Sequence, residues 1–152
     1  MMSIPLVPNL LRSHLAELAL EDKRHDGRQR FEGRDVELEI NCLPRAEGSA
    51  RVRMGDTIVL AGVKFQIMTP YPDRPNEGGL MCSAEVRPVA GRNWEAGPPS
   101  AESIELGRVV DRGIRESGCI NTEDLCIIPG EKAWQVILDV FAVSDDGNLF
   151  DA

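Results

Sequence analysis

Alternation of apolar and polar positions predicts that the first half of the chain is rich in strands. In residues 36–42 apolar side chains alternate with acidic or amide side chains, and in residues 50–54 they alternate with arginines. Residues 57–68 form a longer, mostly apolar run that ends in the same alternation. A period of two is typical of half-buried strands, and short connections between consecutive strands favour an antiparallel meander.

The second half adds further strands and one helix. Residues 80–87 and 125–128 are short strand candidates, and residues 134–142 place every second, apolar side chain on one face. Ser100 is predicted to cap a helix that ends at Gly118. Segments rich in proline and glycine precede and follow the strand at 80–87, and we expect both to be loops.

The N-terminal part is predicted to differ from the rest. Residues 9–20 have the spacing of a short amphipathic helix with Asn9 as its N-cap, and a polar stretch with an Asp26-Gly27 turn follows. We therefore expect residues 1–20 to be an N-terminal helical arm and residues 21–152 to form one domain. The resulting order, α-β-β-β-β-α-β-β, indicates an α+β fold.

The helix predicted after Ser100 carries three arginines on one side. At about 100° per residue its apolar or small face is expected to hold Leu106, Val109, Val110 and Gly113. Arg108, Arg112 and Arg115 lie almost opposite that face, as a ridge that can follow a phosphate backbone. The alternative is a solvated face in which these arginines pair with nearby acids at helical spacing, and the helix alone favours this alternative.

Charge and composition limit the possible partners. The chain has 152 residues and a net charge of -8, which suits one soluble domain and disfavours anionic membrane surfaces. Any contact with RNA or DNA must therefore use a local basic patch, shared with a partner. We expect the four cysteines to be buried free thiols of a cytoplasmic protein, since there is no secretory signal and no apolar run of about 18 residues.

Most catalytic and cofactor signatures are absent from the sequence. It contains no P-loop, no dinucleotide fingerprint, no H-E-x-x-H and no G-x-S-x-G. Asp145 and Asp146 are candidates for Mg²⁺, but the Gly147-Asn148 that follows favours a turn. No cofactor and no metal site is predicted.

An ordered series of motifs resembles the RNase PH family, and most closely the non-catalytic subunits of archaeal RNA exosomes. The motifs are R-H-D-G-R at 24–28, G-S-A-R-V-R-M-G-D-T at 48–57, P-Y-P-D-R-P-N-E-G at 70–78, E-A-G-P-P at 95–99, the arginine helix, and W-Q-V-I-L-D-V at 134–140. The resemblance implies a fold like domain 2 of ribosomal protein S5 (RNase PH-like), here limited to its N-terminal half.

The resemblance also implies partners and a role. It implies a hexameric ring with a catalytic RNase PH-like subunit, RNA-binding cap subunits and single-stranded RNA as substrate. The chain itself would be a non-catalytic, RNA-binding subunit that supports 3′-5′ phosphorolytic degradation by its partner. A phosphorolytic 3′-exoribonuclease in its own right and a purely architectural ring subunit without RNA contact remain as alternatives.

Two departures from the family pattern support the non-catalytic alternative. Catalytic members carry a serine followed by two arginines where this chain has Ser100, Ala101 and Glu102, and a carboxylate there would repel phosphate. The family's catalytic aspartates lie in a second half that would follow Ala152. We therefore expect a fragment, or a chain that has lost about half of the fold, and an apolar face over residues 134–143 that lacks its covering helix.

With the resemblance included, Arg108 and Arg112 become the favoured RNA contacts. Arg115 is an equal candidate for RNA or for an ion pair with Asp111 or Glu116. No catalytic residue is assigned. For Arg51 and Arg53 we favour an interface or solvated role. For Trp94 we favour packing over base stacking, and for Arg28 we favour an ion pair.

Overall fold

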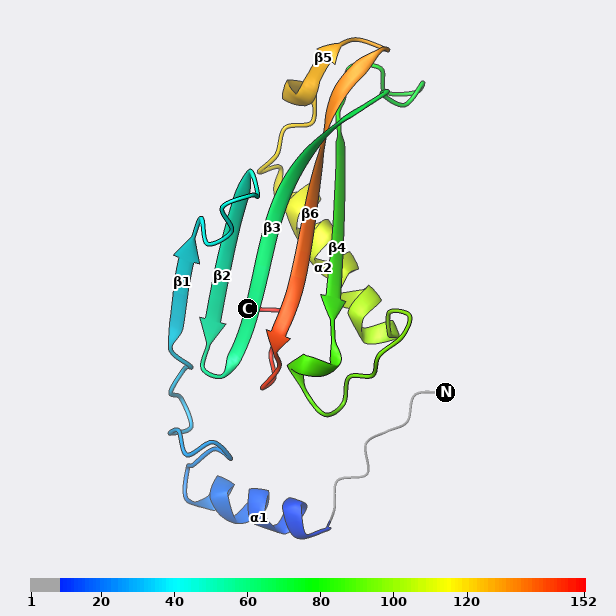
Figure 1. The fold of residues 1–152 in the computed structure, drawn as a ribbon. Helices are drawn as coiled ribbons and strands as arrows, with labels where there is room; N and C mark the ends of the chain where they lie inside the picture. The colour runs from blue at the N-terminus through cyan, green and yellow to red at the C-terminus, as the bar shows by residue number, and fades with distance from the viewer. Residues whose placement is uncertain (1–8) are drawn as a thin grey trace. The chain divides into compact units, whose positions relative to one another are not determined.

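The computed structural model of the chain describes residues 9–152, and its elements follow the predicted order (Figure 1). The described residues up to Arg34 form one compact unit, and Asp35–Ala152 form a larger one. The larger unit contains the strands β1 (Val36–Ile40), β2 (Gly48–Met54), β3 (Thr57–Met68), β4 (Gly79–Val86), β5 (Cys126–Ile128) and β6 (Lys132–Ser144), with the helix α2 (Ala101–Ser117) and the short 3-10 turns η1 (Pro88–Ala90) and η2 (Glu123–Leu125).

The smaller unit is a helix followed by a tight polar turn. Helix α1 (Asn9–Leu20) has the predicted bounds, and none of its residues is buried. In the turn, the Arg24 guanidinium donates two hydrogen bonds to the Arg30 carbonyl, and Arg28 pairs with Asp26 at 2.6 Å. The predicted ion pair of Arg28 is therefore confirmed. The boundary that we expect after residue 20 stays a prediction.

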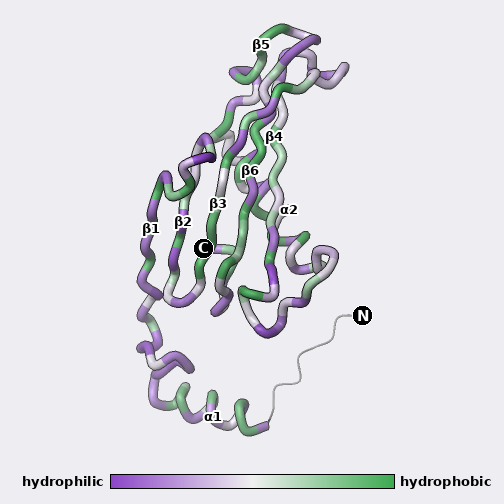
Figure 2. Tube along the Cα trace, in the orientation of Figure 1, coloured by the Kyte–Doolittle hydropathy of each residue, from purple (hydrophilic) through white to green (hydrophobic). Residues whose placement is uncertain are grey.

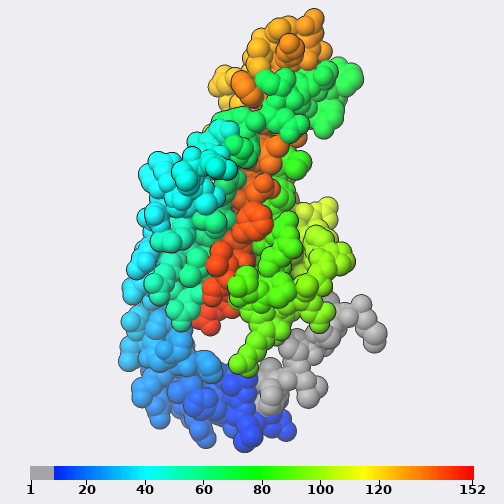
Figure 3. Space-filling view, viewed as in Figure 1, coloured from blue at the N-terminus to red at the C-terminus, as the bar shows by residue number. Residues whose placement is uncertain are grey.

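The sheet of the larger unit confirms the predicted meander and adds a crossover. Strands β1, β2 and β3 are antiparallel neighbours, but β6 inserts between β3 and β4, and β4 runs parallel to β6. Figure 3 shows β6 passing between β3 and β4 on the visible face. Helix α2 connects β4 to β6 as one β-α-β unit, which the succession of strand patterns did not predict.

The pairing register gives the sheet one apolar face and one mixed face. Leu38, Val52, Val59 and Ala142 follow one another across four strands on the apolar face. The neighbouring positions carry charges on the other face, where Arg51 pairs with Glu39 at 2.6 Å. Figure 2 shows the alternation along β1 and β2. Helix α2 contacts β4 but leaves the apolar face uncovered at the β1 edge, where Leu38 is 65% exposed.

The expected open face over residues 134–143 is only partly present. Val136 and Ala142 are buried, whereas Trp134 at the far end of β6 is 39% exposed and packs edge-on against Phe65. The physical reason is that β6 is an inner strand, flanked by β3 and β4. Among the strands, the most exposed apolar side chains lie instead on β1.

Candidate nucleic-acid interface

Helix α2 begins and ends where the sequence predicts. The Ser100 hydroxyl accepts a hydrogen bond from the Ser103 amide at 3.2 Å, which satisfies one of the free donors of the first turn. Gly118 closes the helix in the left-handed conformation with φ 63°, and its amide donates to the Arg115 carbonyl. Both caps hold the helix at a fixed length alongside β4.

Small side chains on α2 let it approach β4 closely. Ser103 and Gly107 are buried, and the Ser103 hydroxyl donates to the Ala84 carbonyl at 2.9 Å. A Cβ atom added to Gly107 would lie 3.2 Å from the Ala84 nitrogen. The contact face of the helix is therefore centred on small residues. Because Ser103 and Gly107 form the contact, the apolar face predicted from the sequence is only partly correct. Leu106 is buried, but Val109 is 43% exposed.

All three predicted arginines line one groove between α2 and β4. The groove has a volume of about 600 Å³, and residues Leu80 to Ala84 form its strand wall. Arg108 and Arg112 are exposed, and in the described part of the chain no ion pair holds either guanidinium. Two unneutralised cations one helical turn apart form a local basic site on an otherwise acidic chain.

Arg115 differs from the other two because its guanidinium is already engaged. Its Nε donates to the Asp111 carboxylate at 2.7 Å, and its Nη2 donates to the Leu80 carbonyl. The hydrogen bond that Arg115 donates to Asp111 raises the pKa of Arg115 above its usual value. An RNA phosphate at this position would compete with both contacts, so RNA binding by Arg115 stays a prediction.

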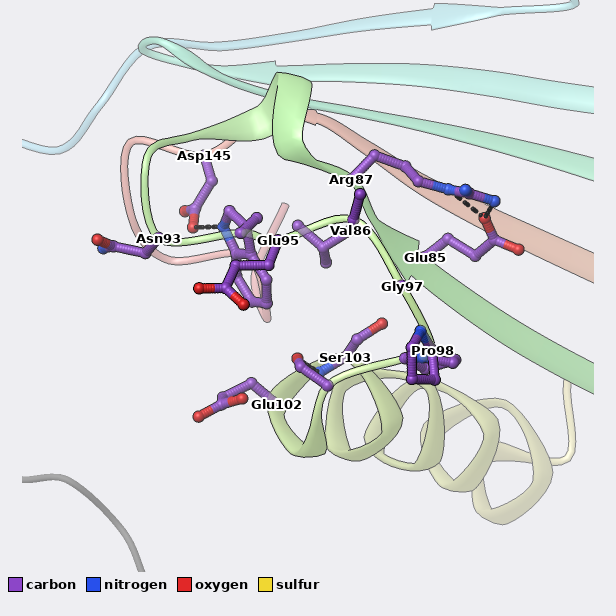
Figure 4. A pocket seen from close by; sticks show the side chains of 14 residues that line it. Glu85, Val86, Arg87, Asn93, Glu95, Gly97, Pro98, Glu102, Ser103 and Asp145 are labelled. Atoms are coloured by element: carbon purple, nitrogen blue, oxygen red, sulfur yellow. Dashed lines mark hydrogen bonds and ion pairs between the residues drawn. The ribbon is translucent and has the colours of Figure 1, made fainter.

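A second cavity lies at the N-terminus of α2, with a volume of about 630 Å³ (Figure 4). Figure 4 shows Glu102 on the helix and Glu95 on the loop at the rim of this cavity. The one arginine of the lining, Arg87, is paired with Glu85. A helix N-terminus ordinarily attracts anions, but the carboxylate of Glu102 in the first turn takes that place. The cavity is therefore unsuited to phosphate.

Trp94 packs into the wall of the same cavity. Its indole N–H donates to the Asp145 carboxylate at 2.8 Å, which agrees with the packing role rather than base stacking. Asp145 also accepts from the Gly147 amide at 2.9 Å, as the predicted turn requires. Among residues 9–152, no group of three or more acids, histidines or cysteines is arranged to hold a metal ion.

The cysteines are less buried than expected. Cys119 is exposed, and Cys42, Cys82 and Cys126 are half-buried, so the prediction of four buried thiols is wrong. Cys119 is exposed because it lies just beyond the Gly118 cap, where the chain leaves the helix. Desolvation raises the pKa of Cys82 in the arginine groove, and Asp111 and Asp139 add to this shift.

Sequence reasoning missed the strand wall of the groove. The ion pair of Arg115 could be found from the sequence, because Asp111 lies four residues earlier on the same helix. The Leu80 carbonyl carries no signal in the sequence, since only the crossover brings β4 under α2. None of the helices within the described residues is long and apolar enough to cross a membrane.

Comparison with known families identifies the class. Residues 32–152 match the model of the 3′ exoribonuclease family, domain 1. The chain therefore belongs to the 3′ exoribonuclease (RNase PH) family, as the ordered motifs predict. Its similar relatives are called exosome complex component Rrp42. The protein from Methanosarcina acetivorans is 47% identical over 147 residues, and the one from Thermococcus kodakarensis is 43% identical over 152 residues.

Solved structures agree with the RNase PH-like fold. A chain of the Archaeoglobus fulgidus exosome with RNA bound to the active site matches at TM-score 0.88 and 47% identity, over 95% of this chain and 57% of that chain. A chain of an archaeal exosome core matches at TM-score 0.76 and 43% identity, over 95% and 54%. The two relatives are matched over 97% and 100% of this chain but 55% and 56% of their own length. The chain thus spans about half the length of the relatives that it matches.

Proposed function

We propose that the chain is a non-catalytic subunit of an exosome ring and holds single-stranded RNA for a catalytic RNase PH-like partner. The observation that carries this proposal is the contrast between two neighbouring sites. Within residues 9–152 neither Arg108 nor Arg112 is held in an ion pair, since the groove's Asp111 pairs with Arg115, whereas the cavity at the start of α2 is lined by Glu95 and Glu102. In the described part of the chain the groove can attract a phosphate backbone, whereas the carboxylates of the cavity disfavour the attacking phosphate.

The relatives support the assembly part of the proposal. Their names describe exosome components, and one similar solved structure is an exosome with bound RNA. We infer the same kind of assembly for this chain, with RNA-binding cap subunits above the ring and a cytoplasmic location. Four unpaired cysteines are consistent with a reducing compartment.

The decisive test measures RNA retention in the assembled complex. We expect Arg108→Ala combined with Arg112→Ala to weaken binding of a fluorescent 20-nucleotide poly(A) by about tenfold or more, because two charge-assisted contacts are lost. The slope of log affinity against log salt should flatten by about 1.4, since each neutralised phosphate of a single strand contributes about 0.7. Fluorescence anisotropy at several salt concentrations gives both quantities.

Arg45→Ala is the control, because it removes one exposed arginine that lines a different pocket from the arginine groove. It should leave the affinity and the salt slope unchanged. If the double variant keeps full affinity in the complex, the arginine groove does not bind RNA and the architectural alternative is favoured. Phosphate-dependent release of nucleotides by the purified chain alone would instead favour an enzyme.

A further inference from the structure

The two edges of the sheet differ in how far the rest of the chain occupies their backbone hydrogen-bonding groups. At the β4 edge, α2 closes the strand: Ser103 donates to the Ala84 carbonyl and Arg115 donates to the Leu80 carbonyl. These two carbonyls lie four residues apart and therefore point to the same side of β4. Side chains of α2 thus occupy acceptors that an added strand would need, which protects this edge.

The β1 edge has no such protection in the part of the chain that the structure describes. The Asp35 carbonyl accepts from the Gly55 amide, and the Asn41 amide donates to the Ser49 carbonyl, so odd-numbered residues face β2. The N–H and C=O groups of the even-numbered residues must then point away from the sheet. Strand β1 pairs only with β2 among residues 9–152, and it forms the margin of the sheet in Figure 1.

The side chains of β1 are as accessible as its backbone. Val36, Leu38 and Ile40 are 61%, 65% and 67% exposed on the apolar face. On the other face Glu39 pairs with Arg51. Glu37 lies opposite Arg53, but that guanidinium donates to the Gly55 carbonyl, and no ion pair to Glu37 is formed in the described chain.

A second copy of the chain is a poor occupant of this edge. Two identical strands related by a twofold axis pair antiparallel. Each such register that pairs at least three residues of β1 and keeps the apolar side chains on one face places glutamate opposite glutamate: Glu37 opposite Glu39, Glu37 opposite itself, or Glu39 opposite itself. Like charges at directly opposed positions destabilise a strand pair. The same two positions would attract a strand that carries cations there.

We propose that β1 binds an extended segment of a different polypeptide, in which apolar residues alternate with lysine or arginine. The main chain of the segment would add a strand at Val36, Leu38 and Ile40, and its cations would face Glu37 and Glu39. Its apolar side chains would cover part of the exposed face. This surface lies at the opposite edge of the sheet from the arginine groove and does not depend on RNA binding.

Synthetic peptides test the proposal directly. The probe is an acetylated seven-residue peptide, Thr-Val-Lys-Val-Lys-Val-Thr, and its controls are the same peptide with glutamate for lysine and one with N-methylated valines. We expect the lysine peptide to bind about tenfold more tightly than the glutamate peptide. The N-methylated peptide, which lacks main-chain donors, should not bind. Amide chemical shifts at Val36, Leu38 and Ile40 report the location.

Charge reversal supplies the second measurement. Glu37→Lys should remove or reverse the preference for the lysine peptide, because this carboxylate is not used in an ion pair within the described chain. Glu131→Lys, the same change at an exposed position outside β1, should leave the preference intact. Equal affinity for the lysine and glutamate peptides, shifts confined to residues outside β1, or no binding at millimolar peptide would each overturn the proposal.

Discussion

Gly78 and Gly113 show how differently one residue type can be constrained. A Cβ atom at Gly78 would lie 2.4 Å from the Trp134 carbonyl oxygen and 2.5 Å from the Leu125 Cβ, so only glycine fits where the loop before β4 crosses β6. The Gly78 amide also donates to the Thr122 carbonyl at 2.8 Å. Gly113 on α2 has no atom within 4 Å of such a Cβ.

We therefore expect opposite effects of the same substitution. Gly78→Ala should lower the free energy of unfolding by about 1–3 kcal/mol, because backbone atoms must move to admit the methyl group. Gly113→Ala should raise it by about 0.5–1 kcal/mol, because alanine restricts the unfolded chain and suits a helix interior. Urea denaturation measures both. Equal effects of the two substitutions would contradict the close approach at Gly78.

At the level of single residues, the sequence predicts contacts between near neighbours well. Arg28 pairs with Asp26, two residues away, and Arg115 pairs with Asp111 on the next turn of one helix. The bonds from Arg115 to Leu80 and from Trp94 to Asp145 join distant segments. Such contacts depend on how the elements pack, which spacing along the chain does not encode.

Among the elements, α2 and the meander could be predicted, whereas the position of β6 could not. Caps and periodicity are local signals, and they give the ends of α2 and the faces of the strands. Alternation tells which side chains share a face but not which strand lies beside another. The crossover therefore had to come from the structure, and with it the groove that gathers the arginines.

The Ser100 cap is a test of how far α2 depends on its own ends. Ser100→Ala removes the acceptor of the Ser103 amide and should lower the free energy of unfolding by about 1 kcal/mol. Ser117→Ala, at the other end of the helix, is the control, because within residues 9–152 this exposed hydroxyl bonds only the nearby Ile114 carbonyl and Cys119 amide. Chemical denaturation compares the two variants. A larger loss at Ser117 would show that the N-cap is not the stronger anchor.

At the scale of the larger unit, one helix covers too little of an apolar sheet face. The residues that remain exposed lie mainly on β1 and at the ends of β3 and β6, and a net charge of -8 opposes their association. The sequence predicted an uncovered apolar surface but assigned it to β6. The family, by contrast, followed from motifs spread along the whole chain.

Acidification should therefore drive the chain to associate. As the pH falls from 7 towards the isoelectric point near 4.8, protonation of carboxylates removes the net negative charge, and self-repulsion disappears while the apolar surface stays exposed. Light scattering across this range should rise steeply. Val36→Thr with Ile40→Thr keeps the β-branched shape and should reduce the rise. An unchanged profile in this variant would mean that another surface causes association.

The insertion of β6 between β3 and β4 also sets an order of events during synthesis. Strands β1, β2 and β3 can pair as soon as they leave the ribosome, because each hydrogen-bonds its neighbour along the chain. Strand β4 emerges next but must wait, unpaired, until α2 and β5 have been made and β6 follows them. Closure of the sheet is therefore a late, long-range step, and a nascent chain halted before Lys132 exposes two strands that only β6 can join.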